Sequence, residues 1–376
     1  MELKIGVSEL ARALARSQGI VEKKSTMPIL SHVLLEARKS GELHLSATDL
    51  DIAVSGDHTC EQVTKEGAVA VPARQLYEIV KSLPEPSASL KKTPNNYLEV
   101  RSGQAEFRIV GLPAEDFPAL PKFDKVQFVA VEPQALLGLI DRTSFAVSTD
   151  ETRYNLNGVY FEPAAGEIRM VATDGHRLSL AQGKVDGDFK LKKGVILPKK
   201  GLYELKKLLS EAVEGGEEKP KADLGFVESS AIFRRPGVVL VMRLIEGMFP
   251  DYRQVIPKAG EKVVKLGRQS FLDTLRRVSL LASEKAHAVK LELSKGSLRV
   301  LSQNPDLGEA KEEITVEYDG EPLKIGFNAR YLMDVLQALA CDDVVLELAD
   351  DLSPGVVKPH GEGEKDYTAV IMPMRI

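Results

Sequence analysis

The residues at 173–177, Thr-Asp-Gly-His-Arg, are the combination of side chains in this sequence that could most readily do chemistry. Asp174 and His176 could exchange protons, and Arg177 could hold an anion, if a nucleophile lay within reach. However, Asp-Gly is also a common turn dipeptide, and a sequence cannot show whether a nucleophile is near. We therefore interpret the segment as a turn and predict that the chain has no catalytic residues.

Metal, disulfide and nucleotide chemistry leave no pattern in the sequence. The two cysteines, Cys60 and Cys341, are far apart, which fits a reducing compartment and gives neither a disulfide framework nor a metal spacing. Neither a P-loop nor a G-x-G-x-x-G fingerprint occurs. The histidines also lack metal-ligand spacing, at positions 32, 44, 58, 176, 287 and 360. We therefore expect no metal, no cofactor and no nucleotide hydrolysis.

The composition is that of a soluble globular protein, with 43% hydrophobic and 28% charged residues. At 376 residues the chain is too long for one ordinary core, so two or three domains are expected. The first residues, Met-Glu-Leu-Lys-Ile, place charges where a signal peptide needs an apolar stretch. No apolar run approaches the roughly 18 residues of a membrane span. We expect a cytoplasmic protein that does not act on a membrane.

The net charge of −5 restricts how the chain could act on nucleic acid. A protein that grips DNA by neutralising phosphates usually carries a strongly basic balance. A role on DNA would therefore need basic residues confined to one surface, or a hold that is topological rather than electrostatic.

The elements that would position these residues repeat three times along the chain. Each of three segments has an apolar strand end, then Pro or Asn, then a basic residue, then an apolar helical stripe. Pro72 and Pro198 suit a first helical turn, and Asn328 can cap the same backbone donors with its side chain. These positions are 126 and 130 residues apart, which is the size of a domain. The segments are 71–80, 197–206 and 327–336.

A second helix is expected upstream in each repeat, at 7–16, 134–145 and 270–281, because apolar residues recur there at helical spacing. Short alternating runs such as 41–47 and 296–301 indicate antiparallel strands between the helices. We predict an α+β protein of three repeated units, each with two helices and about eight antiparallel strands. The predicted domains are 1–127, 128–257 and 258–376. Pro-basic helix openings are common in α/β proteins, but three copies in matching order favour a true repeat.

Six short motifs occur in order on this repeat, and together they are specific although none is so alone. With them the chain resembles, along essentially its whole length, the beta subunit of bacterial replicative DNA polymerase, the sliding clamp. The motifs are Met-Pro-Ile-Leu at 27–30, Ala-Thr-Asp-Leu at 47–50, Arg-Tyr-Asn-Leu-Asn-Gly at 153–158, Val-Ala-Thr-Asp-Gly-His-Arg-Leu at 171–178, Phe-Pro-Asp-Tyr at 249–252 and Met-Pro-Met-Arg at 372–375.

The resemblance implies the DNA clamp fold, in which a head-to-tail homodimer of three-domain chains closes a ring. Helices line the hole, and strands form an outer sheet that continues across boundaries and so removes exposed edges. Twelve helices at roughly 10 Å each would leave a bore of about 28 Å, which passes a duplex. Such a ring encircles DNA and tethers the polymerase for processive synthesis, without catalysis. The alternative is a three-repeat protein-binding scaffold that does not act on DNA, against which the basic bias of the repeated helices argues.

The expected DNA contact is weak, salt-sensitive and blind to sequence, because basic helices attract phosphates without reading bases. The alternative is that these basic residues are ordinary solvated helix faces. Asp150 and Asn155 stand where other members have a glutamine and a tyrosine, and Asp150 would repel phosphate. The resemblance and the repeated helices indicate as DNA-binding residues Lys24, Arg74, Tyr154, Lys199 and Lys200.

The resemblance also implies a groove that takes short motifs from DNA polymerase subunits, the clamp loader and repair factors. The apolar tail at 370–376 would form part of it, because methionines beside a proline make an adaptable surface. The tail could also be a plain last strand, and we expect both. Gln254 stands where some members carry an arginine. The groove residues are Leu156, Thr173, Gly175, His176, Arg177, Leu178, Pro250, Val255, Asn328, Tyr331, Ser353, Val370, Met372, Pro373, Met374 and Arg375.

The dimer seam implied by the resemblance places Phe107 and Ile109 of one chain against Leu280 and Leu281 of the other. Plain core residues are the alternative. An acidic stretch at 306–313 suits an electrostatic seam, but its basic counterpart is thin. We therefore predict a dimer that depends on apolar contacts and is only weakly sensitive to salt.

Overall fold

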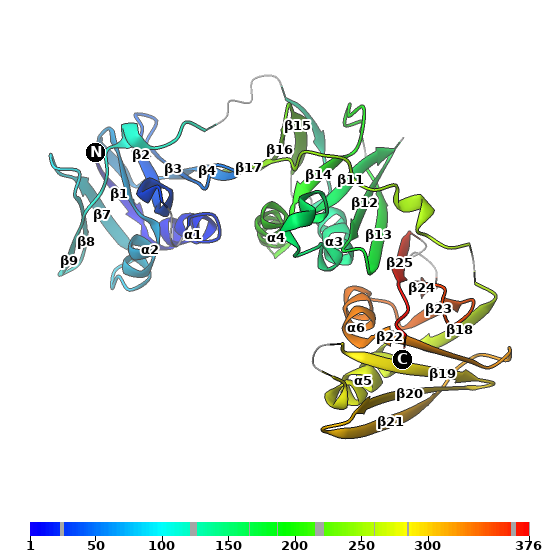
Figure 1. Ribbon diagram of the computed structural model, residues 1–376. Coiled ribbons are helices and arrows are strands. Elements are labelled where there is room, and N and C mark those ends of the chain that lie inside the picture. The colour runs from blue at the N-terminus through cyan, green and yellow to red at the C-terminus, as the bar shows by residue number, and fades with distance from the viewer. Residues whose placement is uncertain are drawn as a thin grey trace. The chain divides into compact units, whose positions relative to one another are not determined.

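The computed structural model describes residues 1–22, 26–120, 126–164, 166–185, 187–214, 222–258, 260–283, 286–361 and 366–375. Six α-helices lie within these residues, and the strands pair antiparallel (Figure 1). The α+β class predicted from the sequence is confirmed. The chain divides into two compact units, Met1–Pro133 with Lys200–Leu244 and Gln134–Lys199 with Ile245–Ile376. None of the helices in the described residues is long and apolar enough to cross a membrane.

The first unit contains two sheets and the helices α1 (Val7–Ser17), α2 (Ala73–Lys81) and α4 (Lys199–Glu214). The smaller sheet has the order β5 (Gln62–Lys65), β1 (Glu2–Gly6), β7 (Ser87–Lys92), β8 (Leu98–Ser102), β9 (Ala105–Ile109). The larger sheet has the order β10 (Gln127–Ala130), β15 (Asp223–Val227), β16 (Ser230–Arg235), β17 (Val238–Arg243), β4 (Ile52–Thr59), β3 (Glu42–Thr48), β2 (His32–Ala37), β6 (Gly67–Pro72).

The second unit also contains two sheets, with the helices α3 (Pro133–Thr143), α5 (Arg268–Val278) and α6 (Ala329–Ala338). The larger sheet has the order β14 (Val195–Pro198), β11 (Gly158–Ala164), β12 (Glu167–Thr173), β13 (Arg177–Lys184), β25 (Tyr367–Ile371), β24 (Gly355–His360), β23 (Asp343–Leu348), β18 (Lys262–Gly267). The smaller sheet has the order β21 (Gly308–Thr315), β20 (Ser297–Asn304), β19 (Ala288–Ser294), β22 (Leu323–Asn328).

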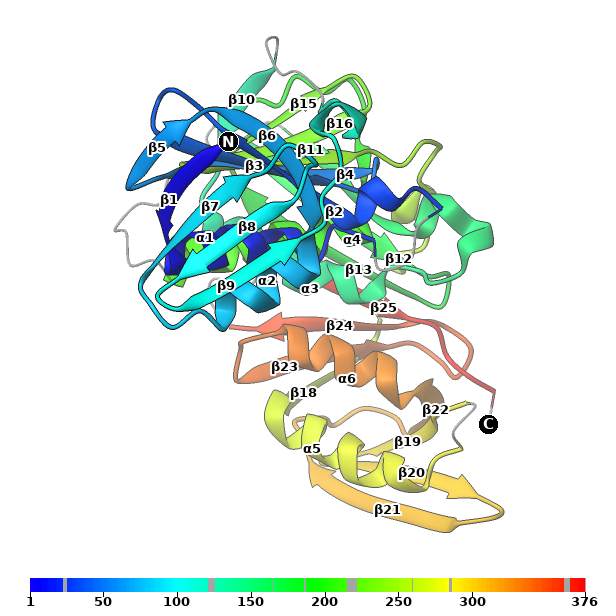
Figure 2. The ribbon, with the colours of Figure 1, turned by 90° about the vertical axis from the view of Figure 1, so that its left-hand side faces the viewer.

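The helices form where apolar residues recur on one face. In α1, Leu10, Ala13 and Leu14 are buried at a spacing of three and four residues, so one side of the helix packs and the other remains polar. Helix α1 packs on α2, and α5 packs on α6, which lies beside it in Figure 2. The side chain of Asn328 accepts from Arg330 N at the start of α6, as predicted. Pro72 occupies the N-cap of α2 and so lies one residue before the first helical turn predicted for it.

Two of the expected helices end earlier than predicted. The segment 270–281 becomes α5 followed by the 3-10 turn η6 (Ser279–Leu281), and 134–145 becomes α3 followed by η3 (Ser144–Ala146). The sequence cannot distinguish a last helical turn from a 3-10 turn, because apolar residues at i and i+3 suit both.

Both large sheets continue across the predicted domain boundaries. Strand β4 of the first predicted domain pairs with β17 of the second, and β13 of the second pairs with β25 of the third. Because these strands are paired on both sides, neither presents free backbone groups to another chain. In the described structure β9 and β21 are edge strands of the two smaller sheets, whose other edges are β5 and β22.

Candidate functional site

The segment 173–177 is a turn, as the sequence predicts. The Thr173 hydroxyl donates to Arg177 O at 2.7 Å and accepts from Gly175 N at 3.1 Å. One oxygen of Asp174 accepts from the backbone N–H groups of His176 and Arg177, at 2.9 and 3.0 Å. Gly175 has φ of +89°, which glycine adopts without strain. The Asp174 carboxylate therefore stabilises the turn through the backbone, and the turn places Arg177 at the start of β13.

Arg177 connects β13 to α6. Its guanidinium donates to Asp174 Oδ2 at 3.1 Å, to Asp334 Oδ2 at 2.5 Å and to Phe145 O at 2.7 Å. It also lies over the ring of Tyr331, 4.4 Å from the centroid. The side chain is only 11% exposed, and its planar fork uses both hydrogen bonding and stacking. Burial, with the nearby Asp174, raises the pKa of Tyr331, so its hydroxyl stays neutral.

The tail follows β25 along the edge of this cluster. Met372 N donates to His176 O at 2.9 Å, and Met374 N donates to Gly326 O at 2.8 Å. Val370 is buried, whereas Met372 is 39% exposed and Arg375 is exposed. The tail thus continues from a strand end and also presents an accessible apolar side chain at Met372.

The remaining predicted groove residues lie on several loops of the second unit. Leu178 pairs with Val370 in register, and both belong to one buried cluster. Ser353 donates to Asp350 and lies in the loop between β23 and β24. The others occupy the ends of elements: Leu156 ends η4 (Glu151–Leu156), Asn328 caps α6, and Pro250 and Val255 flank η5 (Tyr252–Gln254).

Sequence reasoning missed Phe145 and Asp334, which hold Arg177. Asp334 lies three residues after Tyr331 on α6, and residues at this spacing share a helix face, so the helical pattern could have indicated it. Phe145 acts through its carbonyl oxygen, which no side-chain pattern reveals, and its ring centroid lies 5.3 Å from Arg177 Cζ. Gln254 donates to Asp251 within its own turn.

The predicted DNA-binding residues differ in how much they are already engaged. Lys24 lies outside the described residues. Lys200 pairs with Asp49 and donates to Ile20 O at 3.1 Å. Arg74, Lys199 and Arg330 open α2, α4 and α6, and none of the three has a carboxylate partner among the residues that the structure describes.

Tyr154 is 58% exposed on η4, and the two doubtful neighbours are engaged within the same region. Asp150 caps η4 and accepts from Thr152 N at 3.0 Å. Hydrogen bonds from Thr152, first from its hydroxyl, lower the pKa of Asp150. Asn155 donates to Met248 O at 2.9 Å. Asp150 therefore remains a negative charge next to the proposed DNA contact.

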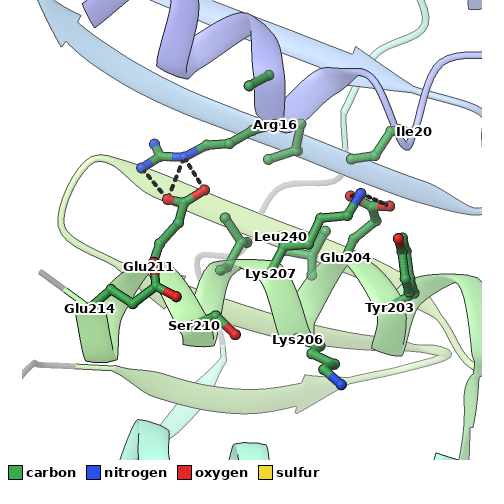
Figure 3. Close-up of a pocket in the computed structure, with 13 residues that line it drawn as sticks. Arg16, Ile20, Tyr203, Glu204, Lys206, Lys207, Ser210, Glu211, Glu214 and Leu240 are labelled. Carbon is green, nitrogen blue, oxygen red and sulfur yellow. Dashed lines mark hydrogen bonds and ion pairs between the residues drawn. The ribbon is translucent and has the colours of Figure 1, made fainter.

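A groove of about 440 Å³ separates α1 from α4 in the first unit (Figure 3). Arg16 of α1 and Glu211 of α4 point toward each other across it, with Nη2 2.8 Å from Oε2. Arg235 reaches the same carboxylate at 2.6 Å. Arg12 pairs with Glu9. The two arginines of α1 are therefore neutralised by neighbouring carboxylates, which reduces their value for binding phosphate.

Family models match in three consecutive blocks of the chain. They describe the N-terminal domain of the DNA polymerase III beta subunit at residues 1–121, its central domain at 130–251 and its C-terminal domain at 253–375. The chain belongs to the DNA polymerase III beta subunit family. The resemblance seen in the sequence is confirmed, and the chain is a sliding clamp that serves DNA polymerase III in processive replication.

Curated relatives and solved structures agree with this family over the full length. The beta sliding clamps of Caulobacter vibrioides and Pseudomonas aeruginosa are 38% and 36% identical, over all of both chains in each case. The solved sliding clamp of Pseudomonas aeruginosa has a TM-score of 0.90 at 35% identity, and that of Bartonella birtlesii, bound to griselimycin, has 0.93 at 36%. Both structures cover the whole of both chains.

The residues of the predicted dimer seam lie on and beside the two edge strands. Phe107 and Ile109 belong to β9, where Phe107 is half-buried and Ile109 is buried. Leu280 is 77% exposed on η6, which contacts β21, and Leu281 is half-buried beside it.

Two of the acidic residues expected at the seam, Glu312 and Glu313, are paired within the chain. Glu312 accepts from Arg277 and Thr274, and Glu313 accepts from Ser297 and Arg299. Hydrogen bonds from these partners lower the pKa of both carboxyl groups, with Arg277 the main cause for Glu312. The charges of Glu312 and Glu313 are therefore largely neutralised within the chain, whereas Asp306 and Glu309 of the same stretch are exposed.

Proposed function

We propose that the surface formed by β13, α6 and the tail binds the short peptide motifs of DNA polymerase subunits, the clamp loader and repair factors. The observation that carries this is the Arg177 cluster, which fixes Tyr331 beside the turn that hydrogen-bonds the tail. Met372 and Met374 are unbranched and adaptable, so one surface can fit several apolar motifs.

We further propose that two copies join head to tail through β9 and β21 and close a ring around double-stranded DNA. Adding one edge strand to another satisfies backbone groups that would otherwise face solvent. Phe107 and Ile109 would meet Leu280 and Leu281, and the exposure of Leu280 supports an apolar contact. The local pairing of Glu312 and Glu313 supports a seam that depends little on charge.

The proposed hold on DNA is independent of sequence and mainly topological. The basic residues that open α2, α4 and α6 would contact phosphates, together with Tyr154 and Lys24. The proposed role is non-catalytic, because Asp174 supports a turn rather than acting on a substrate. The expected place of action is the bacterial cytoplasm.

The proposed peptide-binding surface of β13, α6 and the tail is tested by competition between a peptide and griselimycin. A fluorescent peptide with two leucines and a phenylalanine is titrated with the protein, and its polarisation is recorded. Griselimycin, which was solved bound to the clamps of Pseudomonas aeruginosa and Bartonella birtlesii, is then added. We expect the peptide to bind and griselimycin to displace it. Absence of peptide binding at high protein concentration would refute the proposed groove.

A further inference from the structure

One isolated backbone bridge recurs in all three repeats, and it shows which residues of the three repeats occupy equivalent positions. In each repeat a single antiparallel bridge joins the strand before the second helix to the segment that follows the last strand. The bridges are Ala70 with Leu112, Ile196 with Ile245, and Gly326 with Met374. On the neighbouring strand, Ala70 pairs with Leu34, Ile196 pairs with Tyr160, and Gly326 pairs with Lys290. These three positions are therefore equivalent.

In the first two repeats a phenylalanine from the following segment covers this position. Phe117 is buried in a cluster against which Leu34 packs. Phe249 stacks on Tyr160 with ring centroids 4.9 Å apart and planes within 7°. An apolar side chain of the chain itself is thus the normal occupant when the strand residue is apolar.

In the third repeat the strand residue is Lys290, and the corresponding space is a pocket of about 460 Å³. The pocket lies beside β19 and β22, between the loop that follows β23 and the tail. Lys324 is 69% exposed and Arg375 is exposed, so both can reach an incoming group. The full lining is Lys290, Lys324, Ile325, Gly326, Asp351, Leu352, Met374 and Arg375.

The charges favour an anion. The Nζ atoms of Lys290 and Lys324 lie 3.2 and 3.5 Å from Oε1 of Glu292. Asp351 also lines the pocket. Among the lining residues three cations face the one carboxylate of Asp351, and Glu292, which lies outside the lining, is shared by Lys290, Lys324 and Arg299, so the described lining keeps a positive charge in excess. Each ammonium has three donors, so both lysines can bind a further carboxylate without releasing Glu292. A hydrogen bond from Lys290 lowers the pKa of Glu292, which shows that these lysines stabilise a carboxylate at this place.

We propose that this pocket binds an acidic side chain, Asp or Glu, that flanks the apolar motif of a partner peptide. The inference rests on the proposed peptide groove and extends it. Met374 and Arg375 belong to both the groove and the pocket, and Leu352 of the pocket adjoins Ser353 of the groove. A peptide anchored in the groove would therefore carry its flanking residue directly over the lysines.

The test compares peptides that share one Leu/Phe core and differ only in a Glu-Glu or Gln-Gln extension at either end. Their affinities are measured by fluorescence polarisation with the full chain and with the variant Lys290→Gln/Lys324→Gln. The control variant Lys184→Gln/Lys295→Gln removes the same charge from exposed lysines of the same unit that do not line the pocket.

We expect the Glu-Glu extension at one end to tighten binding to the unaltered chain about three- to fivefold, the range of a partly exposed ion pair. The gain should disappear in the pocket variant and persist in the control, while the Gln-Gln peptides bind all three proteins equally. No gain with the unaltered chain, or a gain that survives in the pocket variant, would overturn the acidic pocket. If the Gln-Gln peptides do not bind at all, the groove itself fails, and the acidic pocket fails with it.

Discussion

The two joints between successive repeats have the same backbone and different side chains. At the first joint Arg243 N donates to Asp51 O at 2.8 Å, and at the second Met372 N donates to His176 O at 2.9 Å. The turn before each joint is also the same, since Asp49 accepts from Ile52 N as Asp174 accepts from Arg177 N.

Three positions distinguish the joints. The place of Arg177 is taken by Ile52 at the first joint, that of Tyr331 by Gly201, and that of Asp334 by Glu204. The first joint thus lacks the stacked arginine, and its charged contacts are Lys200 with Asp49 of the turn and Arg16 with Glu211 between α1 and α4. One backbone design therefore serves as a structural contact in one place and, in our proposal, as a binding surface in another. The side chains on α6 and the tail account for the difference.

Removal of the tail should have the largest effect on the difference between the two joints. A chain truncated after Ile371 should lose peptide binding below detection, because Met372 and Met374 supply much of the apolar surface. The β25 strand remains, so folding and self-association should persist. Polarisation measures the first expectation, and sedimentation with small-angle scattering measures the second. Unchanged peptide affinity would show that the tail is only a strand end.

Replacing Arg177 with the residue of the first joint, as Arg177→Ile, should weaken peptide binding about tenfold, as expected for loss of a buried stacked arginine. Asp334 would lose its cation, and Tyr331 would lose the group that orients it. Arg177→Lys keeps the charge but lacks the planar fork, so it should weaken binding to a similar degree. Full affinity in the lysine variant would mean that only charge matters.

The first joint should respond to Glu211→Gln in stability rather than in binding. Arg16 and Arg235, whose side chains are 11% and 16% exposed, would lose their shared carboxylate. We expect a loss of about 1.5–3 kcal/mol in the free energy of unfolding, the range of hydrogen bonds to charged groups. Glu214→Gln, at an exposed position of the same helix, serves as control. Denaturant unfolding should separate the two variants, and peptide affinity should not change in either.

The smallest effect is expected at the turns. Leu50 has φ of +80° at the place where Gly175 has +89°. Leu50→Gly should relieve the left-handed strain and, after the greater freedom of glycine in the unfolded chain is counted, stabilise the protein by about 0.5 kcal/mol. Gly175→Ala should destabilise it by about 1 kcal/mol. Equal melting temperatures for both variants and the parent would contradict the assigned backbone strain.

Much of the fold could be predicted from the sequence because it repeats. Pro72, Pro198 and Asn328 mark equivalent helix starts, and the structure places all three directly before helices. The contacts that build the site were less accessible. Arg16 and Glu211 are 195 residues apart, and charged residues are so common on helices that no pattern selects this pair.

The strand pairing across each joint has a consequence for any single repeat taken alone. A fragment cut between the first and second predicted domains would separate β4 from β17 and leave both with bare backbone donors and acceptors. Cutting after the second would do the same to β13 and β25. Isolated repeats should therefore associate with one another, or with other sheets, through these exposed strand edges. Each repeat thus protects its neighbour from aggregation, and the chain is stable against misassembly only as a continuous array.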